Sequence, residues 1–540
     1  MLKLRAQWIV LVKRLPASLP AIFAMGLVLR VLALVFYRMI DSDSAHYGSI
    51  ARFFAEGHWQ RALDPYWPPL YPFIISLFVR LGVSLEASGI AVSLLASSGI
   101  VVLCYFLGKR FGGDRVGRVA AILAAIHPRL IAISQSYMTE PLYSFFSTGA
   151  LIAFVLIVSG TNRGLGKRAS LFFATGIILA AAFLTRPEAL FYFILICGAG
   201  IWLLIVRPAL RSGVPKTSPA AAAGCLFLLL AGFLLPSLPY LTRVTSLQKR
   251  LTLGEKAEAN FYLAYKEDYQ KAGIRVELSD YESITSPETP RQPGNYHILS
   301  FLQRRPGKIA PRMLKNFIGA LGDKIPSLMY WPLILLSLFG LVSVRKVKGR
   351  PSNIDFILWI FVPVLLYSPL FLYRRFFTPL LPPMIVWCAV GIDELRSRLS
   401  HRAFVASMIA GAMILLALTP FSLSRQSWPV LYKEAGLWLK TNAKGPVIIA
   451  GRKPEISFYA GAEFHPLNAR KLDDLQQFLK TRKVTHLVVE DYILPASHPG
   501  LASLLDPGST PPWLVPVYTG HKEGRTLILY EFLDPPSKQE

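Results

Sequence analysis

The chain contains few cysteines and few charged residues for its length. Its four cysteines fall within apolar segments, where a thiol usually behaves as a small hydrophobe, and they show neither a disulfide framework nor the spacing of a zinc site. Charged residues make up only 17% of the 540 residues, against 53% hydrophobic residues. Such values lie outside the usual range of soluble globular domains. The sequence therefore predicts a polytopic membrane protein.

Acidic residues are scarcer than basic ones, with 32 Asp and Glu against 58 Lys and Arg and a formal net charge of +26. A nucleic-acid partner would require the basic residues on one stripe or tail. They occur instead in short clusters that alternate with apolar runs, at residues 3–14, 109–118, 163–168, 207–216, 345–350 and 396–402. Under the positive-inside rule these clusters are cytoplasmic, and we expect no nucleic-acid partner.

Apolar runs recur through the first 420 residues, and each needs about 20 residues to cross about 30 Å of hydrocarbon. We predict about 11 transmembrane helices, at residues 16–40, 85–107, 119–135, 141–159, 170–185, 188–206, 218–241, 327–344, 354–372, 376–392 and 403–420. The first run lacks a small-residue cleavage site, so we expect an uncleaved span. With the basic clusters inside, the N-terminus is cytoplasmic, whereas loop 41–84, turn 138–141, loop 242–325 and the residues after 420 lie outside.

Two segments of the first outer loop are apolar without being clear spans. Residues 66–82, YWPPLYPFIISLFVRLG, barely reach spanning length and begin with prolines that suit a helix start. A full crossing would place the basic cluster 109–118 outside, so we expect an interfacial or re-entrant element, or the tilted outer part of a long second span. Residues 44–60 predict an amphipathic helix in the membrane interface, the alternative being a plain surface helix.

Residues 421–540 differ from the transmembrane domain predicted at 1–420. The strand-like segments GPVIIAG, THLVVEDYIL, WLVPVYTG and RTLILYEF alternate with the helical segments PEISFYAGA and KLDDLQQFLKT. This pattern predicts a small extracytoplasmic α/β domain. It contains no phosphate-binding glycine loop, so we expect it to assist catalysis rather than to perform it.

Three acidic residues lie at the predicted outer edge of the membrane, where a carboxylate is costly and therefore a functional candidate. Asp41 and Asp43 follow the first span, and Glu140 lies in the short turn 138–141. The alternatives are helix capping for the aspartates, and a solvated turn or a capping box for Glu140. Topology places Asp43 and Glu140 on one side of the membrane.

Three arginines at the same edge are candidate phosphate ligands, because a guanidinium offers a planar set of donors. Arg186 interrupts an apolar stretch in LTRPEAL, beside the helix-breaking Pro187. The alternative is that Arg186 pairs with Glu188 in a short turn. Arg374 and Arg375, in LYRRFFTPLLPP, violate the positive-inside rule, and they bind a lipid-linked phosphate or extend to headgroups.

These motifs, in this order, resemble the glycosyltransferases of the GT-C fold. The resemblance is closest to the superfamily of dolichyl-phosphate-mannose protein mannosyltransferases and bacterial aminoarabinose lipid A transferases. The matching segments are DSDSAHYGSIARFFAEGHW, PPLYP, MTEPLYSF, LTRPEAL and RRFFTPLLPP, which extend to about residue 391. The resemblance implies a membrane enzyme that moves a sugar from a polyprenyl phosphate to a lipid, glycan or protein acceptor on the outer face.

In that family the acidic residue of the first outer loop serves catalysis, and Asp43 is the matching position. Many relatives have Asp-Glu there, whereas Ser44 follows Asp43 in this chain, which leaves Asp41 as the other nearby acid. We expect a direct, inverting displacement in which Asp43 accepts the proton of an acceptor hydroxyl. Arg186, Arg374 or Arg375 would neutralise the departing phosphate.

Other polar residues of these motifs complete the expected site. Glu140 orients the acceptor, or joins Asp43 in holding a divalent cation, and the need for a metal stays open. His46, Tyr47 and Glu188 are expected in the substrate pocket.

Two other classes of function remain open. A transporter or flippase for a lipid-linked or polar solute also uses intramembrane charges and broken helices, but the sequence shows no inverted repeat. A membrane scaffold that binds a cell-wall partner would tolerate alanine at the outer charges. We expect a bacterial inner membrane, because no endoplasmic-reticulum retrieval signal ends the sequence.

Overall fold

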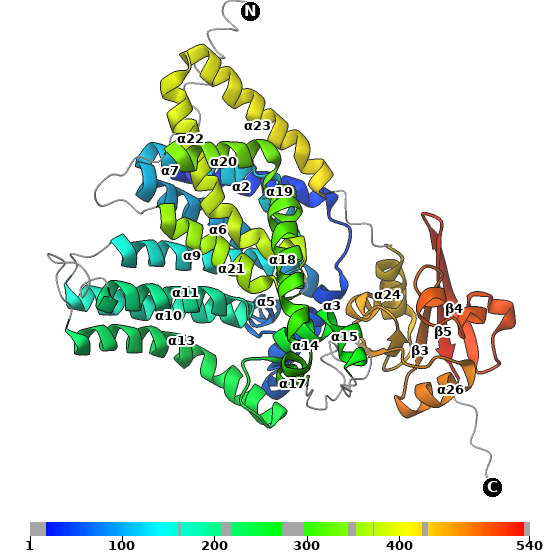
Figure 1. Ribbon diagram of the computed structural model, residues 1–540. Helices are drawn as coiled ribbons and strands as arrows, with labels where there is room; N and C mark the ends of the chain where they lie inside the picture. Colours follow the sequence, from blue (N-terminus) through cyan, green and yellow to red (C-terminus); the bar gives the residue numbers. More distant parts are fainter. Residues whose placement is uncertain are drawn as a thin grey trace, which may run out of the picture.

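The computed structural model describes residues 18–159, 164–206, 218–272, 296–343, 353–370, 372–423 and 430–533. The basic clusters predicted at 3–14, 207–216 and 345–350 lie outside the described residues, as do residues 273–295 of the predicted outer loop. The described chain forms a large helical bundle with a smaller strand-containing domain beside it, as Figure 1 shows.

Eight helical segments among the described residues are long and apolar enough to cross a membrane. With the short segments that extend them, they are α2 (Leu19–Ala33), η1 (Leu34–Phe36), α6 (Leu85–Gly112), α9 (Glu140–Ser159), α10 (Leu165–Thr185), α11 (Ala189–Ile201), η2 (Trp202–Val206), α13 (Pro219–Gln248), η5 (Arg374–Leu380), α22 (Leu381–Arg398) and α23 (His401–Leu423). The predicted class, a polytopic helical membrane protein, is confirmed.

Two bent helix pairs raise the number of spans to 10 if each pair is one span. The first is α7 (Asp114–Ile126) with α8 (Pro128–Ser134), bent by 56°. The second joins Pro306–Met329 to α20 (Trp331–Ser343) at 104°. Its first arm contains η3 (Pro306–Lys308), α18 (Ile309–Gly319), η4 (Ala320–Lys324) and α19 (Ile325–Met329). The remaining predicted span, 354–372, is only partly helical, as α21 (Asn353–Tyr367), and its apolar part is shorter than a membrane span.

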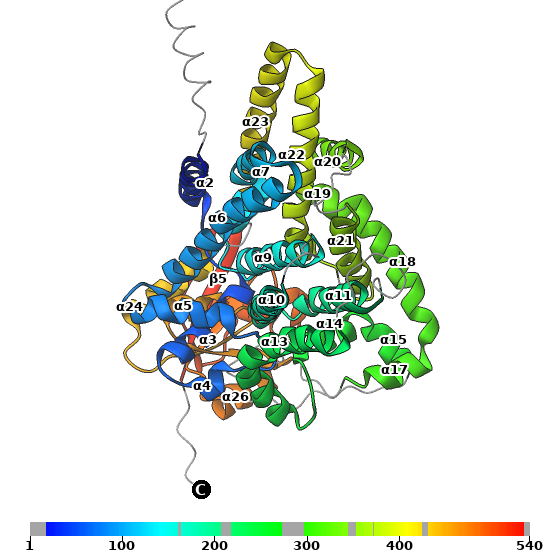
Figure 2. The same ribbon diagram turned by 90° about the vertical axis from the view of Figure 1, so that its left-hand side faces the viewer.

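Helices α9, α10, α11 and α13 lie side by side, which Figures 1 and 2 show from two directions. Glycines allow the closest approaches. A Cβ added to Gly176 of α10 would lie 2.3 Å from the carbonyl oxygen of Leu229 in α13, and one added to Gly340 of α20 would lie 1.8 Å from that of Trp387 in α22. Small residues thus allow backbones to touch, as is typical of helix pairs in membranes.

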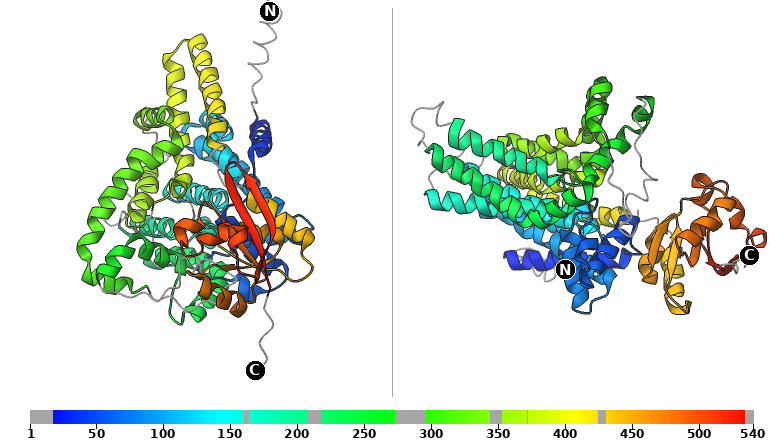
Figure 3. Two further views of the ribbon diagram at one scale, coloured as in Figure 1. Left: turned by 90° about the vertical axis from the view of Figure 1, so that its right-hand side faces the viewer. Right: turned by 90° about the horizontal axis from the view of Figure 1, so that it is seen from below.

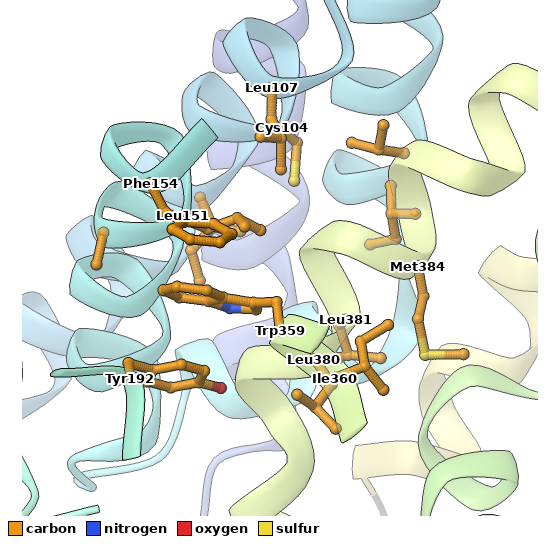
Figure 4. Close-up of a cluster of buried hydrophobic side chains, with 14 of the residues drawn as sticks. Cys104, Leu107, Leu151, Phe154, Tyr192, Trp359, Ile360, Leu380, Leu381 and Met384 are labelled. Carbon is orange, nitrogen blue, oxygen red and sulfur yellow. The ribbon is translucent and has the colours of Figure 1, made fainter. Parts of the chain in front are cut away.

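Aromatic rings fill the centre of the bundle (Figure 4). Trp359 of α21 stacks on Tyr192 of α11, with ring centroids 4.2 Å apart and planes 15° apart, and lies 5.6 Å from Phe154 of α9. Trp359 is fully buried. The short helix α21 is therefore held inside the bundle by ring packing.

A buried arginine in the first span donates hydrogen bonds to backbone carbonyls at the break in the third span. Pro128 cannot continue α7, which leaves carbonyl groups without helical partners. Arg30 of α2 donates hydrogen bonds to two of these carbonyls, those of Ala124 (3.1 Å) and Ala125 (3.2 Å), and to the hydroxyl of Ser97 (2.9 Å). The bend between α7 and α8 and the charge in α2 therefore stabilise each other.

The segment predicted as the first outer loop is more compact than the sequence predicts. Residues 44–60 do not form one interfacial helix: α3 (Ser42–Ala55) ends before Gly57, which has φ +84°, and α4 (Trp59–Ala62) follows. Most of α3 is buried, because it packs against α5 (Leu70–Arg80), α6 and the C-terminal domain. A turn at Gly82, with φ +86°, separates α5 from α6, so the apolar segment 66–82 is not the outer part of the second span.

The predicted outer loop 242–325 is largely helical where it is described. Helix α13 continues to Gln248, and shorter helices follow before α18, at α14 (Glu255–Ala264), α15 (Lys266–Lys271) and α17 (Ile298–Arg304). Tyr269 of α15 stacks on Phe301 of α17, with centroids 4.4 Å apart. This pairing holds the two sides of the loop together.

The C-terminal domain contains a five-stranded sheet in the order β2-β1-β3-β5-β4. The first three strands are parallel and the last two pairings are antiparallel. Its elements are α24 (Leu431–Asn442), β1 (Ile448–Gly451), α25 (Glu455–Ala460), β2 (Glu463–Pro466), α26 (Leu472–Thr481), β3 (His486–Glu490), α27 (Leu494–Ser497), η6 (Ala502–Leu505), η7 (Pro507–Ser509), β4 (Leu514–Lys522) and β5 (Arg525–Phe532). The four predicted strands are present; β2, with four residues, is an addition.

The C-terminal domain docks on the start of α6 and on the segment after the first span (Figure 3). Glu86 of α6 accepts hydrogen bonds from the ammonium of Lys433 (3.1 Å) and from the hydroxyls of Tyr459 (2.7 Å) and Tyr37 (2.8 Å). The hydroxyl of Tyr459 in turn accepts one from the backbone N–H of Ile40 (3.0 Å). One carboxylate thus joins the bundle to the domain.

We expect Gly340→Ala to lower the melting temperature of the purified protein. The added methyl group meets the backbone at Trp387, so α20 must move away from α22, at an overpacking cost of about 1 to 3 kcal/mol. Gly198→Ala is the matched control, because it also replaces a helical glycine and nothing lies within 4 Å of the added atom. Equal melting temperatures for the two variants would contradict the close approach of α20 and α22.

Candidate active site

Five charged side chains form one connected cluster beside the C-terminal domain. Asp43 comes from the first turn of α3, Glu140 from the start of α9, Arg186 and Glu188 from the turn between α10 and α11, and Arg375 from η5. Carboxylates and guanidiniums alternate along the cluster. The structure therefore brings together five of the residues that the sequence nominates for the site.

Local sequence explains why these side chains lie at the ends of helices. Asp43 and Glu140 each occupy the first turn of a helix, where a carboxylate interacts favourably with the helix dipole. Arg186 follows the last residue of α10 in an extended conformation, since a residue before proline avoids helical geometry. Pro187 thus turns Arg186 out of the helix and into the cluster.

The guanidinium of Arg186 is buried and fully matched by carboxylates. It donates to both oxygens of Glu188 (2.9 and 3.3 Å), to Glu140 (2.8 Å) and to the hydroxyl of Thr139 (3.3 Å). Only 4% of Arg186 is exposed, and the ring of Phe376 covers it at 4.9 Å. The alternative that Arg186 pairs with Glu188 is what the structure shows, although the turn is buried. The N–H donors of Arg186 thus contact oxygens of the protein.

Arg375 links Asp43 to the rest of the cluster. Its Nη2 donates to Oδ2 of Asp43 (2.8 Å), and its Nε lies 3.5 Å from Oε1 of Glu140. Burial acts to raise the pKa of Asp43, but the positive charges of Arg375 and Lys256 outweigh it and hold that pKa below its usual range. Asp43 is therefore ionised at neutral pH, and 31% of its side chain is exposed.

Asp41 caps helix α3 and does not join the cluster. One of its oxygens accepts hydrogen bonds from the backbone N–H of Ser44 (3.0 Å) and from the Ser44 hydroxyl (2.7 Å). Burial, together with the charge of Asp43, raises the pKa of Asp41 to about 6. The capping alternative therefore describes Asp41, which leaves Asp43 as the candidate base.

A tryptophan that the sequence motifs do not nominate packs against other polar residues of the site. Trp67 is buried, His46 stacks on it at 5.4 Å, and the ring of Tyr47 meets its edge at 4.8 Å. The ammonium of Lys256 lies 4.5 Å from the Trp67 ring centroid. Burial and the charge of Arg186 lower the pKa of Lys256 to about 8. The unusual YWPP segment is the only sequence signal for Trp67, and Lys256 has none.

Lys256 and Arg374 are two cations of this region that have no carboxylate partner within the described residues. Among the residues that the structure describes, neither forms an ion pair. Arg374 does not point into the cluster with Arg375; it lines a pocket formed with α8, α19 and α23. These two cations therefore keep charge available for an anionic ligand.

The two carboxylates considered as metal ligands are already bound by arginines. Asp43 and Glu140 both contact Arg375, and Glu140 also accepts a hydrogen bond from Arg186. Over the described ranges, no group of three or more His, Cys, Asp or Glu side chains is placed to hold a metal ion. Each of these two carboxylates thus has one oxygen bound by a guanidinium, Oδ2 of Asp43 and Oε1 of Glu140.

The C-terminal domain contacts the residue between the two aspartates. The hydroxyl of Ser42 donates to Oε1 of Glu455 (2.8 Å) and accepts from the ammonium of Lys453 (3.2 Å). Glu455 is fully buried, and burial raises its pKa to about 7. The first turn of α3, which carries Asp43, is thus held from the side of the C-terminal domain.

The fold defines the class of the protein: it has the GT-C fold of membrane glycosyltransferases, as the sequence motifs predict. The profile of the dolichyl-phosphate-mannose-protein mannosyltransferase family matches residues 67–235, a range that includes Glu140 and Arg186 but neither Asp43 nor Arg375. None of the curated proteins compared with the chain matches it.

Three solved structures are similar to this chain over most of its length. ArnT from Cupriavidus metallidurans, bound to undecaprenyl phosphate, has a TM-score of 0.56 at 13% identity, and the match covers 97% of this chain and 98% of that one. The Archaeoglobus fulgidus oligosaccharyltransferase has a TM-score of 0.56 at 12% identity, over 87% and 69%. The mycobacterial arabinofuranosyltransferase AftD has 0.50 at 14%, over 96% and 42%. At these identities the likeness is one of fold.

We expect the thermal stability of the protein to fall as the pH rises from about 5 to about 7. The pKa of Glu455 is about 7 in the folded protein against an ordinary 4.5, so the folded state binds more protons between these values. The free energy of unfolding then falls by up to about 1.4 kcal/mol per pH unit. The loss of stability is complete above the pKa that Glu455 has in the folded protein.

Melting curves of the purified protein across this pH range measure the effect. Glu455→Gln should reduce the slope, and the exposed Glu463→Gln in β2 is the matched control. Because the pKa of Asp41 is also raised, the stability of Glu455→Gln should still fall with pH, with a smaller slope. An unchanged slope in Glu455→Gln would contradict the burial of an ionisable Glu455 at this contact.

Proposed function

We propose that the chain is a glycosyltransferase that moves a sugar from a polyprenyl-phosphate donor to a hydroxyl of a lipid, glycan or protein acceptor. The observation that carries the proposal is the ionised, partly exposed carboxylate of Asp43, fixed by Arg375 at the mouth of a GT-C bundle. The family profile over residues 67–235 supports the same chemistry.

Asp43 has an oxygen available to act as the general base. Oδ2 accepts from Arg375, whereas Oδ1 has no hydrogen-bond donor among the residues that the structure describes. Oδ1 takes the proton of the acceptor hydroxyl as that oxygen attacks the anomeric carbon. The bond from the anomeric carbon to the phosphate oxygen breaks, and its electron pair leaves with the lipid phosphate. A single displacement of this kind inverts the anomeric centre.

We assign different roles to the predicted arginines. Arg186 and Arg375 are positioning residues, because their charges are matched by Glu140, Glu188 and Asp43. The departing phosphate needs a cation without such a partner, and Lys256 and Arg374 are the two that flank the cluster. Positive charge at the leaving group stabilises the transition state.

We further propose a cytoplasmic N-terminus, an extracytoplasmic C-terminal domain and, on the earlier expectation, a bacterial inner membrane. Helix α6 supports the orientation, because it begins beside the C-terminal domain at Glu86 and ends in the basic cluster 109–118. Its 28 residues separate the two ends by about 40 Å, at about 1.5 Å per residue. The positive-inside rule makes the basic end cytoplasmic.

We expect Asp43→Asn to lower sugar transfer or donor hydrolysis by about 10²-fold to 10⁴-fold, the usual contribution of a general base. Release of radiolabelled sugar from polyprenyl-phosphate donors by the purified protein in lipid measures it, at equal folded yield. Asp41→Asn is the matched control, because asparagine also caps a helix and should preserve turnover. Full activity in Asp43→Asn would exclude the base, and no donor consumption across a broad panel would favour a transporter or flippase.

We expect Arg375→Gln to move the acidic limb of the pH profile of kcat/KM to higher pH. Loss of this positive charge raises the pKa of Asp43, so the base becomes protonated at a higher pH than in the native protein. The exposed Arg38→Gln, which removes an arginine paired with Glu523, is the control. An activity loss that is equal at every pH would mean that Arg375 acts on structure alone.

A further inference from the structure

A pocket of about 410 Å³ lies beside the sharp bend between α19 and α20. It is formed by α8, η4, α19, α20, η5 and α23, so it joins elements distant in sequence. Its walls are both charged and apolar, and the lining residues are Arg129, Gly322, Asp323, Pro326, Ser327, Tyr330, Trp331, Arg374, Leu418, Phe421 and Ser422. No step proposed so far uses this pocket except through Arg374.

Two guanidiniums line the pocket, and Glu140, a carboxylate whose charge acts on Arg129, is already bound by Arg186. Arg129, in α8, and Arg374 act on each other as like charges. Nε of Arg129 is buried and has no hydrogen-bond partner, and neither arginine forms an ion pair within the described part of the chain. The one carboxylate of the lining, that of Asp323, is bound by Lys324 at 2.6 Å. Paired guanidiniums in this state fit the oxygens of a phosphate.

The remaining wall suits a hydrocarbon chain. Trp331 is 58% exposed and Phe421 71% exposed, and both lie on helices that are candidate membrane spans. These apolar side chains line the same pocket as the two arginines. A ligand that fills it must therefore be anionic at one end and apolar at the other.

The backbone at the pocket is strained. Tyr330, at the bend between α19 and α20, has φ +64°, which a residue other than glycine rarely adopts. Its hydroxyl shares a hydrogen bond of 2.6 Å with Ser422 of α23. Strain of this kind persists only where the surroundings enforce it, and it occurs preferentially at functional sites.

We infer that this pocket holds the phosphate of the lipid-linked donor between Arg129 and Arg374, with the prenyl chain leaving along Trp331 and Phe421. The inference rests on the proposed function and names the donor's place in it. Arg374 directly precedes Arg375, which holds Asp43, so η5 carries both a residue of the phosphate subsite and the partner of the proposed base. Arg129 becomes a substrate-binding residue that the sequence motifs do not nominate.

Direct binding tests the inference without any need for turnover. The full chain in phosphatidylcholine nanodiscs is titrated with radiolabelled undecaprenyl phosphate, and undecaprenol, inorganic phosphate and phosphatidylglycerol serve as competitors. Arg129→Gln and Arg374→Gln should each weaken binding by roughly tenfold, the loss expected for one charged hydrogen bond. The exposed Arg38→Gln should leave it unchanged.

Asp323→Asn supplies a variant whose expected effect cannot arise from misfolding. It removes the only negative charge of the lining, so it should tighten binding of undecaprenyl phosphate. Equal competition by phosphatidylglycerol would overturn the inference in favour of a general headgroup site, and displacement by inorganic phosphate alone would overturn it in favour of free phosphate. Loss of binding in Lys256→Gln but in neither arginine variant would place the phosphate at Trp67 instead.

The two proposals fail in distinguishable ways. Asp43→Asn should bind the donor as the native chain does while losing turnover, because Asp43 is not part of the pocket. If Asp43→Asn retains turnover, the proposed base is wrong and the phosphate subsite is unaffected. If Asp43→Asn loses turnover but the arginine variants bind normally, the base is supported and the subsite is overturned.

Discussion

The guanidinium of Arg375 holds together the two carboxylates around which the site is arranged. Asp43 follows the first span and Glu140 begins a later one, and neither contact is local in sequence. Near hydrocarbon an unpaired charge is costly, and the charge of Arg375 offsets that of both carboxylates. The side chain of Arg375 consequently links α3, α9 and η5. It also orients the carboxylate of Asp43, the proposed base.

The sequence predicts those parts of the site that interrupt an apolar pattern. Asp43, Glu140 and Arg375 stand out because charge is rare at a membrane edge, and the order of the spans places them on one side. Lys256 lies in a polar loop where a lysine is ordinary, so no local signal marks it. Arg129 does interrupt a predicted span, and that charge is the signal from which it can be found.

In the fold, too, some features follow from local sequence and others depend on tertiary packing. Apolar runs predict the number of spans closely, and Pro128 marks the break between α7 and α8. No glycine marks the bend at Tyr330 in the sequence, and this bend depends on packing against α23. Helix α3 has the pattern of an interfacial helix, yet most of it is buried against α5, α6 and the C-terminal domain, and nothing in its own sequence reveals that packing.

The contact between Arg30 and the carbonyls of Ala124 and Ala125 constrains how the chain is assembled during synthesis. The guanidinium enters the bilayer with the first span, more than ninety residues before these two carbonyls are made. Before the third span is made, the guanidinium can bond the carbonyl of Gly26 in its own helix and the hydroxyl of Ser97 in the second span. Its set of hydrogen bonds is completed when the third span packs against the first, so the final packing of the first span depends on a segment that is synthesised later.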